Sequence, residues 1–100
     1  MPILGCEEEE VKRRVFDPLV WGTVDASKTH GDEVEYFVAI GKEHWGKRET
    51  IVLKIQMSYG GKRSGRKAPS FPIDSDDWNR VINMMQKVKD EYAAGKRGAV

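Results

Sequence analysis

The chain has 100 residues, with 17 lysines and arginines against 16 aspartates and glutamates, so its formal net charge is +1. Such a length corresponds to one domain, and a composition of 39% hydrophobic and 33% charged residues is ordinary for a soluble globular protein, though on the charged side. No apolar run approaches the ~20 residues of a membrane span, and no secretory signal opens the sequence. The single cysteine, Cys6, cannot form an internal disulfide, which predicts a protein of the reducing cytoplasm.

The charges are unevenly distributed although their sum is close to zero. Glu7 to Glu10 form an acidic block, and from Lys42 to Ile73 eight bases stand against only two acids. Such asymmetry points to a polyanionic partner more strongly than net charge does. The eight bases are Lys42, Lys47, Arg48, Lys54, Lys62, Arg63, Arg66 and Lys67.

Three strands are predicted in the first part of the chain. Residues 1–12 are expected to form a flexible acidic tail that precedes a domain over residues 13–95. The segment 14–27 mixes β-branched and aromatic residues around Pro18, which predicts an edge or bent strand. After a turn at 28–33, the residues of 33–42 alternate between an apolar and a mixed face, and after a second turn at 43–48 those of 49–59 alternate more cleanly.

The second part predicts a basic hairpin loop, a short strand and a helix. Residues 60–67 read as the loop, and 68–73 as a fourth strand that its two prolines confine to an edge. Asp74 is the expected N-cap of a helix, with Ile73 and Trp78 spaced as a hydrophobic staple. An apolar stripe then predicts the core-facing side of that helix, which ends at Gly95, and residues 96–100 are expected to fray. The stripe consists of Trp78, Val81, Ile82, Met85, Val88 and Tyr92.

The predicted fold is therefore α+β, with a four-stranded antiparallel sheet followed by one C-terminal helix. Because the strand at 49–59 has one apolar and one polar face, the helix should cover one side of the sheet and leave the other free.

Enzymatic and metal-binding motifs are missing from the sequence. His30 and His44 stand alone in predicted turns, without a second ligand at metal spacing. Asp74, Asp76 and Asp77 are explained by helix capping rather than by acid–base chemistry. The run "GGKRSG" lacks the Gly-Lys-Ser/Thr ending of the phosphate-binding loop. We therefore expect no enzyme activity, no metal and no cofactor.

The features that binding of a single-stranded nucleic acid requires are present together. Such binding needs cations that follow the phosphates and aromatic faces on which bases stack. Trp21, Phe37, Trp45 and Tyr59 are possible platforms. The candidate nucleic-acid-binding residues are Lys42, Trp45, Lys47, Arg48, Lys54, Gln56, Tyr59, Lys62, Arg63, Arg66 and Lys67.

The segment "IVLKIQMSYGGKRSGRKAPSFPIDSDDW" resembles the core of the transcriptional coactivator positive cofactor four family, including its bacterial and archaeal relatives. The resemblance rests on a strand that ends in an aromatic residue, Tyr59, on the Gly-Arg-Lys run at residues 65–67, and on Trp78 at the helix start. It covers about the last half of the chain. Gln56 stands where the family often has an arginine.

The resemblance implies a curved sheet whose channel holds single-stranded DNA, and a homodimer built through the helices. It further implies phosphate contacts for Arg66 and Lys67 and base stacking for Tyr59. The expected protein is thus a cytoplasmic, nucleoid-associated binder of single-stranded DNA with little sequence preference. It would serve transcription or genome maintenance, with transcription or replication proteins as possible further partners.

Two alternatives remain open at this point. The ligand could be single-stranded RNA, since a basic aromatic face does not by itself distinguish the two nucleic acids. The chain could instead be a small protein-interaction module whose helix docks a partner through the apolar stripe and the methionine pair Met84 and Met85, with the basic loop serving only solubility.

Overall fold

The computed structural model describes residues 16–100, and the predicted acidic tail lies outside this range. Five strands, one short 3-10 helix and one α-helix follow in chain order. They are β1 (Phe16–Asp25), η1 (Lys28–His30), β2 (Val34–Trp45), β3 (Arg48–Tyr59), β4 (Lys62–Arg63), α2 (Asp77–Ala93) and β5 (Gly98–Ala99).

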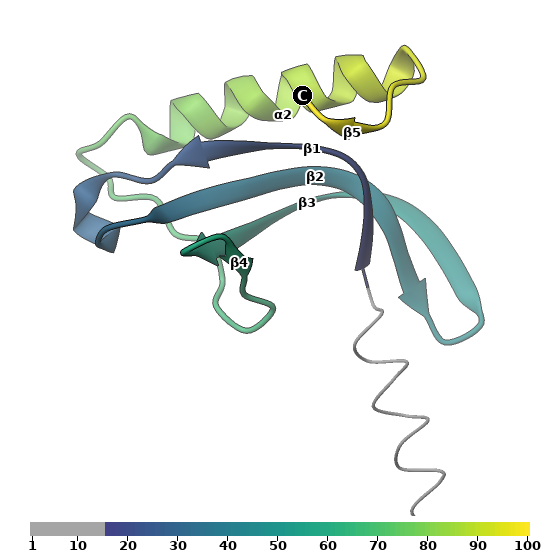
Figure 1. Ribbon diagram of the computed structural model, residues 1–100, viewed down its shortest axis with the longest axis horizontal. Helices are drawn as coiled ribbons and strands as arrows, with labels where there is room; N and C mark the ends of the chain where they lie inside the picture. The colour runs from purple at the N-terminus through teal and green to yellow at the C-terminus, as the bar shows by residue number, and fades with distance from the viewer. Residues whose placement is uncertain (1–15) are drawn as a thin grey trace, which may run out of the picture.

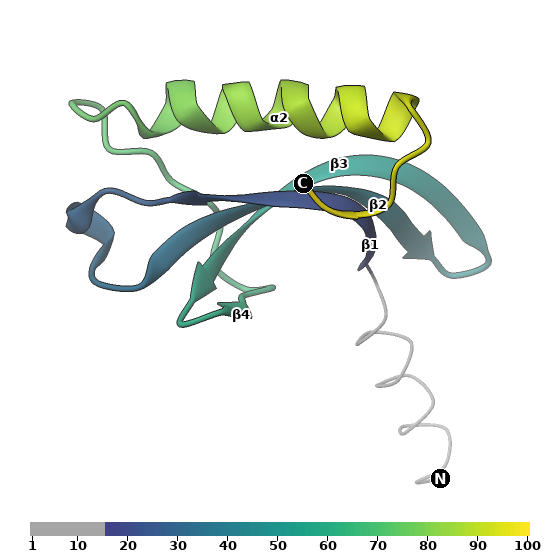
Figure 2. The same ribbon diagram turned by 45° about the horizontal axis from the view of Figure 1, so that its top comes forward.

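The strands form one sheet in the order β4-β3-β2-β1-β5, antiparallel throughout except for the parallel β1–β5 pair. Figure 1 shows α2 lying along one side of this curved sheet, while β4 and the loop after it lie on the other side. The same separation is visible in the turned view of Figure 2. The α+β class is confirmed, but the prediction of four strands is wrong because the sheet has five.

The strand predicted over 68–73 is also absent, and β4 lies instead inside the predicted basic loop. A two-residue turn at Gly60 and Gly61 places β4 beside the end of β3, and both glycines have positive φ. Such tight hairpin turns require that conformation, which glycine adopts without strain. The two prolines of 68–73 instead keep this stretch out of the ladder.

The alternation of side chains along β2 and β3 divides the sheet into two faces, as predicted. The even-numbered residues of β2 from Val34 to Ile40 are buried in the core, together with Met57 of β3. Val20 and Val24 of β1 join them, and Val81 and Val88 of α2 close the core from above. Burial of these side chains is the main stabilising contribution, at about 25 cal/mol per Å² of apolar surface.

The helix begins later than predicted. Its N-cap is Asp76 rather than Asp74, and Asp76 makes no side-chain capping bond. Ile73 is fully exposed, so it cannot form a staple with Trp78, which is itself 48% exposed. Ile82 is exposed as well, so only part of the predicted stripe faces the core. The reason is that α2 lies over β1 and β2, so a side chain on its flank has no strand beneath it.

A bulge in β1 bends the sheet where Pro18 interrupts the ladder. The register with β2 shifts between Pro18 and Val20, so Leu19 is the extra residue. Opposite the bulge, Gly41 is fully enclosed by the backbone of Asp17 and Pro18, which leaves no room for a Cβ. The expectation of a bent strand around Pro18 is therefore confirmed.

The C-terminus is paired where the sequence predicts fraying. Gly98 and Ala99 lie parallel to Val20 and Trp21, and the Val100 amide donates to the Trp21 carbonyl at 2.8 Å. Gly95 has a φ of 82° just after the helix, which lets the chain reverse there. Across residues 16–100, α2 is too short and too polar to traverse a lipid bilayer.

Candidate nucleic-acid interface

We call the sheet surface opposite α2 the free face. It carries the residues of β1, β2 and β3 whose side chains alternate with the buried ones, together with Arg63 of β4. Its aromatic and polar members include Phe16, Trp21, Thr23, Phe37, Lys54, Gln56 and Arg63, and the acids Asp25, Glu35 and Glu43 lie on the same side.

An aromatic pair with a guanidinium lies at the centre of the free face. The rings of Trp21 and Phe37 are stacked at 6.2 Å between centroids, at an interplanar angle of 28°. The Arg63 guanidinium lies over the Phe37 ring, 4.9 Å from its centroid, and donates to the Gln56 side-chain oxygen at 3.3 Å. Both rings are only partly buried, so this face presents π-surface and positive charge side by side.

Two of the predicted bases are neutralised by neighbouring acids. Lys54 donates to Glu43 at 2.7 Å and also lies 5.2 Å from the Phe16 ring centroid. Lys42 points to the helix side of the sheet, where it pairs with Glu49 at 3.4 Å. Their net contribution to an anion site is accordingly smaller than the sequence suggests.

The hairpin between β2 and β3 places another aromatic residue beside cations. Trp45 is 63% exposed and pairs across the turn with Arg48, and Lys47 lies in the turn itself. By alternation, Trp45 and Arg48 belong to the free face. Neither cation forms an ion pair within residues 16–100, so both are available to phosphates.

The basic loop after β4 is locally ordered by a serine. The Ser64 hydroxyl accepts from the amides of Arg66 at 3.4 Å and Lys67 at 3.2 Å. Lys67 places its ammonium 5.1 Å from the centroid of the Tyr59 ring. Tyr59 has the alternation of the core-facing residues and packs against the core, and Lys62 lies opposite it. These residues therefore line the sheet edge next to the free face rather than its centre.

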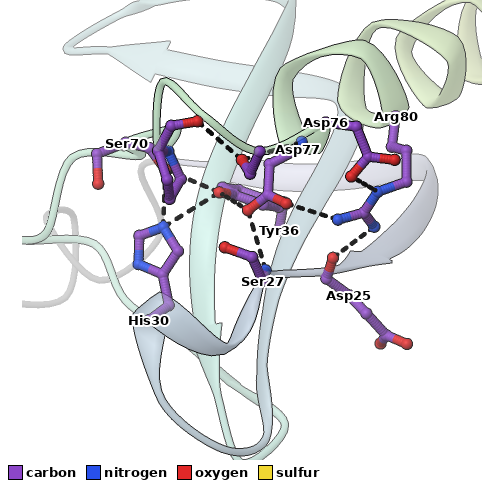
Figure 3. A network of polar contacts seen from close by, with 10 residues as sticks. Asp25, Ser27, His30, Tyr36, Ser70, Asp76, Asp77 and Arg80 are labelled. Carbon is purple, nitrogen blue, oxygen red and sulfur yellow. Dashed lines mark hydrogen bonds and ion pairs between the residues drawn. The ribbon is translucent and has the colours of Figure 1, made fainter.

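A buried polar network holds the C-terminal end of this loop in place at Ser70 (Figure 3). The Asp77 carboxylate is fully buried and accepts from the Tyr36 hydroxyl at 2.8 Å and from the Ser27 amide at 3.0 Å. The Ser70 carbonyl lies 2.8 Å from the Tyr36 hydroxyl and 2.9 Å from His30 Nε2. The loop, the β1–β2 connection and the start of α2 thus meet at one tyrosine.

An arginine completes the network on the helix side. Arg80 donates to Asp77 at 2.6 Å, to Asp76 at 3.1 Å and to the Asp25 carbonyl at 2.7 Å. Because Ser70 offers only a carbonyl oxygen, His30 Nε2 must carry the proton if it donates there. Every partner in this arrangement is structural, so the aspartates at the helix start hold the fold together.

The ionisation of the network fits a structural role. Burial by itself raises the pKa of the Asp77 carboxyl, but hydrogen bonds from Ser27 and Tyr36 and a nearby guanidinium outweigh it, and the pKa is lowered. Burial and the neighbouring Asp77 raise the pKa of Tyr36 above its ordinary value of 10.0. Asp77 is therefore a stable anion and Tyr36 a stable neutral donor at neutral pH, and neither is poised to exchange protons.

Among residues 16–100 no group of three histidine, cysteine or acidic side chains is arranged to hold a metal ion. His44 Nε2 donates to the Asp17 carboxylate at 3.0 Å at the surface. In the part of the chain that the structure describes, each histidine therefore links two segments by a hydrogen bond.

The predicted residues fall into three places. Lys54, Gln56 and Arg63 lie on the free face, joined at its hairpin end by Trp45, Lys47 and Arg48. Lys62, Arg66, Lys67 and Tyr59 gather at the β4 edge, and Lys42 lies on the helix side. The centre of the face is built on Trp21 and Phe37, which the sequence predicts as possible stacking platforms although they are not among the candidate binding residues. Their alternation with buried residues along β1 and β2 is the signal that marks them.

Comparisons of the chain with protein-family models, with curated proteins and with solved structures gave no match.

Proposed function

We propose that the protein binds single-stranded nucleic acid through the free face and the adjacent basic loop, and that single-stranded DNA is its preferred ligand. The observation that carries the proposal is the Trp21–Phe37 pair with Arg63 over the Phe37 ring. A base that stacks on such a platform contributes about 1–3 kcal/mol, and every base offers a π-face, so binding is tolerant of sequence. A role in transcription or genome maintenance, in the cytoplasm with the nucleoid, follows as part of the proposal.

The arrangement of cations supports a strand that crosses the free face. Arg48 and Lys47 lie at the hairpin end, the Arg63 guanidinium lies over the Phe37 ring, and Arg66 lies in the loop after β4. These cations can therefore bind phosphates on both sides of the Trp21–Phe37 pair, while the bases stack on the rings. The neutralised Lys54 and Lys42 are expected to contribute little, since their charges already have acidic partners.

The proposal is tested by titrating labelled oligothymidine with the protein at several salt concentrations. We expect the logarithm of the association constant to fall linearly with the logarithm of salt concentration, with a slope of about −0.7 per phosphate contacted. Oligouridine and a duplex of equal length serve as comparisons that separate DNA from RNA and single from double strands. Absence of any retention at low salt would reject nucleic-acid binding.

A matched pair of tryptophan variants locates the site. Trp21→Ala removes a ring from the free face and should weaken oligothymidine binding by about 1–3 kcal/mol. Trp78→Ala removes a half-exposed ring from the opposite side of the sheet and should leave binding unchanged. Equal effects of the two substitutions would place the strand elsewhere.

A protein-interaction module is the second candidate function. Trp78 and Ile82 are exposed on the flank of α2, and large exposed apolar side chains often mark docking surfaces. In that case oligonucleotides would not bind, and Ile82→Asp would abolish capture of the protein partner. The exposed aromatic face on the other side of the sheet favours the nucleic-acid proposal.

A further inference from the structure

The outer edge of β3 is open over most of its length. Its neighbour on that side, β4, pairs only with Ser58 and Tyr59, and Ser64 donates to the Met57 carbonyl at 2.8 Å. In the described chain, residues 16–100, no other segment lies beside β3 there. An edge strand of this kind presents unpaired amides and carbonyls that another strand can use.

The register identifies which backbone groups are available. Both the amide and the carbonyl of a residue in an antiparallel strand point to the same side, and successive residues alternate. Since the Met57 carbonyl points outward to Ser64, the odd-numbered residues of β3 point outward and the even-numbered ones bond to β2. The open groups therefore belong to Glu49, Ile51, Leu53 and Ile55.

Three of the four open residues, Ile51, Leu53 and Ile55, have apolar side chains. Ile51 is 44% exposed, and Leu53 and Ile55 are partly buried on the helix side, where α2 lies over β1 and β2 instead. Edge strands are often protected by a lysine directed outward. Lys54 instead extends inward to Glu43 of the neighbouring strand β2, at 2.7 Å.

We propose that two copies of the chain pair antiparallel through their β3 edges, with Val52 of each on the two-fold axis. This register is the one that uses all four open residues, because it pairs Glu49 with Ile55 and Ile51 with Leu53 and stops before Met57, whose carbonyl is already bonded. About eight main-chain hydrogen bonds would form between the copies.

The side chains of the two copies are complementary in the same register. On the helix side, Ile51 faces Leu53 of the second copy, so the two central pairs are apolar, and Glu49 faces Ile55 at each end. On the free face Val52 faces its own counterpart and Thr50 faces Lys54, so no like charges stand opposite each other. If one strand were shifted by two residues toward the β2–β3 hairpin, Arg48 would stand opposite Lys54 and the two positive charges would repel each other.

Such a dimer differs from one built through the helices, and its consequence for binding rests on the proposed function. The two sheets become one continuous sheet of ten strands, since each copy contributes five. A two-fold axis perpendicular to the sheet keeps both free faces on the same side. A nucleic-acid strand could then pass from one aromatic platform to the other without leaving the surface.

Cysteine cross-linking tests the register. Non-hydrogen-bonded pairs in an antiparallel ladder have Cα atoms about 4.5 Å apart, which a disulfide can span. In a chain with Cys6→Ser, we expect Val52→Cys to give a disulfide-linked dimer on mild oxidation. Thr50→Cys is the control, because its two copies would lie about 13 Å apart. Equal cross-linking of the two variants, or none, would overturn the proposal.

Sedimentation equilibrium without nucleic acid tests the association itself. The parent chain should dimerise, and Val52→Lys, which sets two ammonium groups opposite each other on the axis, should weaken the dimer at least tenfold. Thr23→Lys adds the same charge at an exposed position of β1, away from the proposed interface, and should leave the dimer affinity unchanged. A parent that stays monomeric, or a Val52→Lys dimer as tight as the parent, would refute edge pairing.

Oligothymidine binding per chain by Val52→Lys is measured separately, so a failure of this proposal and a failure of the proposed function remain distinguishable.

Discussion

Asp77 shows how a single side chain can hold together segments that are distant in sequence. It joins Tyr36, Ser27 and Arg80, which come from β2, from the start of the η1 turn and from α2. A buried carboxylate is tolerated only when its oxygens are satisfied, and here they accept three hydrogen bonds. The residue is therefore a structural anion, although its place at a helix start suggests an ordinary cap.

Asp77→Asn should lower the free energy of unfolding at pH 7 by roughly 2–4 kcal/mol, because the buried hydrogen bonds lose their charge and Arg80 loses a partner. The pKa of Asp77 is lowered by folding, so its stabilising contribution is complete above the ordinary value of 3.8 and is lost as pH falls through the lower folded value. Urea unfolding between pH 7 and pH 2 should therefore show the gap between parent and variant closing in acid. Asp76→Asn, an exposed partner of the same arginine, should cost less than about 1 kcal/mol.

Arg63→Ala should weaken oligothymidine binding and make the salt slope shallower by about 0.7, because one phosphate contact is lost. Arg97→Ala is a matched control. Its guanidinium also lies over a ring, 4.7 Å from the Tyr92 centroid, but at the end of α2 and away from the free face. A similar loss in both variants would indicate a general charge effect rather than a site.

At the scale of elements, the local sequence pattern predicts the central strands β2 and β3 but not the edge strands β4 and β5. The alternation of β2 and β3 is visible in the sequence because one face must be apolar and the other need not be. Residues 96–100 pair with β1, and the Asp77 contact to Ser27 spans 50 positions in the chain. No window of sequence contains both partners of such contacts. The free face was predictable as a polar surface, but its neutralised lysines were not, since Glu43 meets Lys54 only after the strands have paired.

Gly41→Ala should destabilise the fold by about 1–3 kcal/mol, since the new methyl group would meet the backbone of the β1 bulge, which cannot easily move. Gly22→Ala is the comparison. Its methyl group would meet chiefly the flexible Met84 side chain, so the loss should be smaller. Thermal unfolding of both variants measures the difference, and a greater loss for Gly22→Ala would contradict this account of the bulge.

The basic loop should contribute to binding and not to folding. Arg66 and Lys67 are exposed, and the hydrogen bonds that order the loop use their backbone amides. The double substitution Arg66→Ala with Lys67→Ala should weaken oligothymidine binding while shifting the melting temperature little. A large fall in melting temperature with unchanged binding would assign these residues to the structure instead.

On the scale of the whole molecule, the two sides of the sheet have different surfaces. One side buries the core under α2 and fastens the chain connections through a polar network, and the other presents aromatic rings and cations to solvent. Substitutions on the free face should accordingly leave the core undisturbed, so they can test the proposed binding. The proposed edge pairing would keep this division, because it adds strands without covering either free face.

The hydrogen bond between the Tyr36 hydroxyl and the Ser70 carbonyl predicts how the protein responds when its backbone is cleaved. The exposed basic residues at 62–67 lie between β3, which is embedded in the sheet, and a segment that Tyr36 and His30 hold by its Ser70 carbonyl. Brief trypsin treatment should therefore cut the backbone there while the N-terminal sheet fragment and the C-terminal helix fragment stay associated. Size-exclusion chromatography of the nicked protein would show one peak with two polypeptides, and separation of the fragments would contradict this. The protein would then be divisible into two complementing pieces at the very loop proposed to touch its ligand.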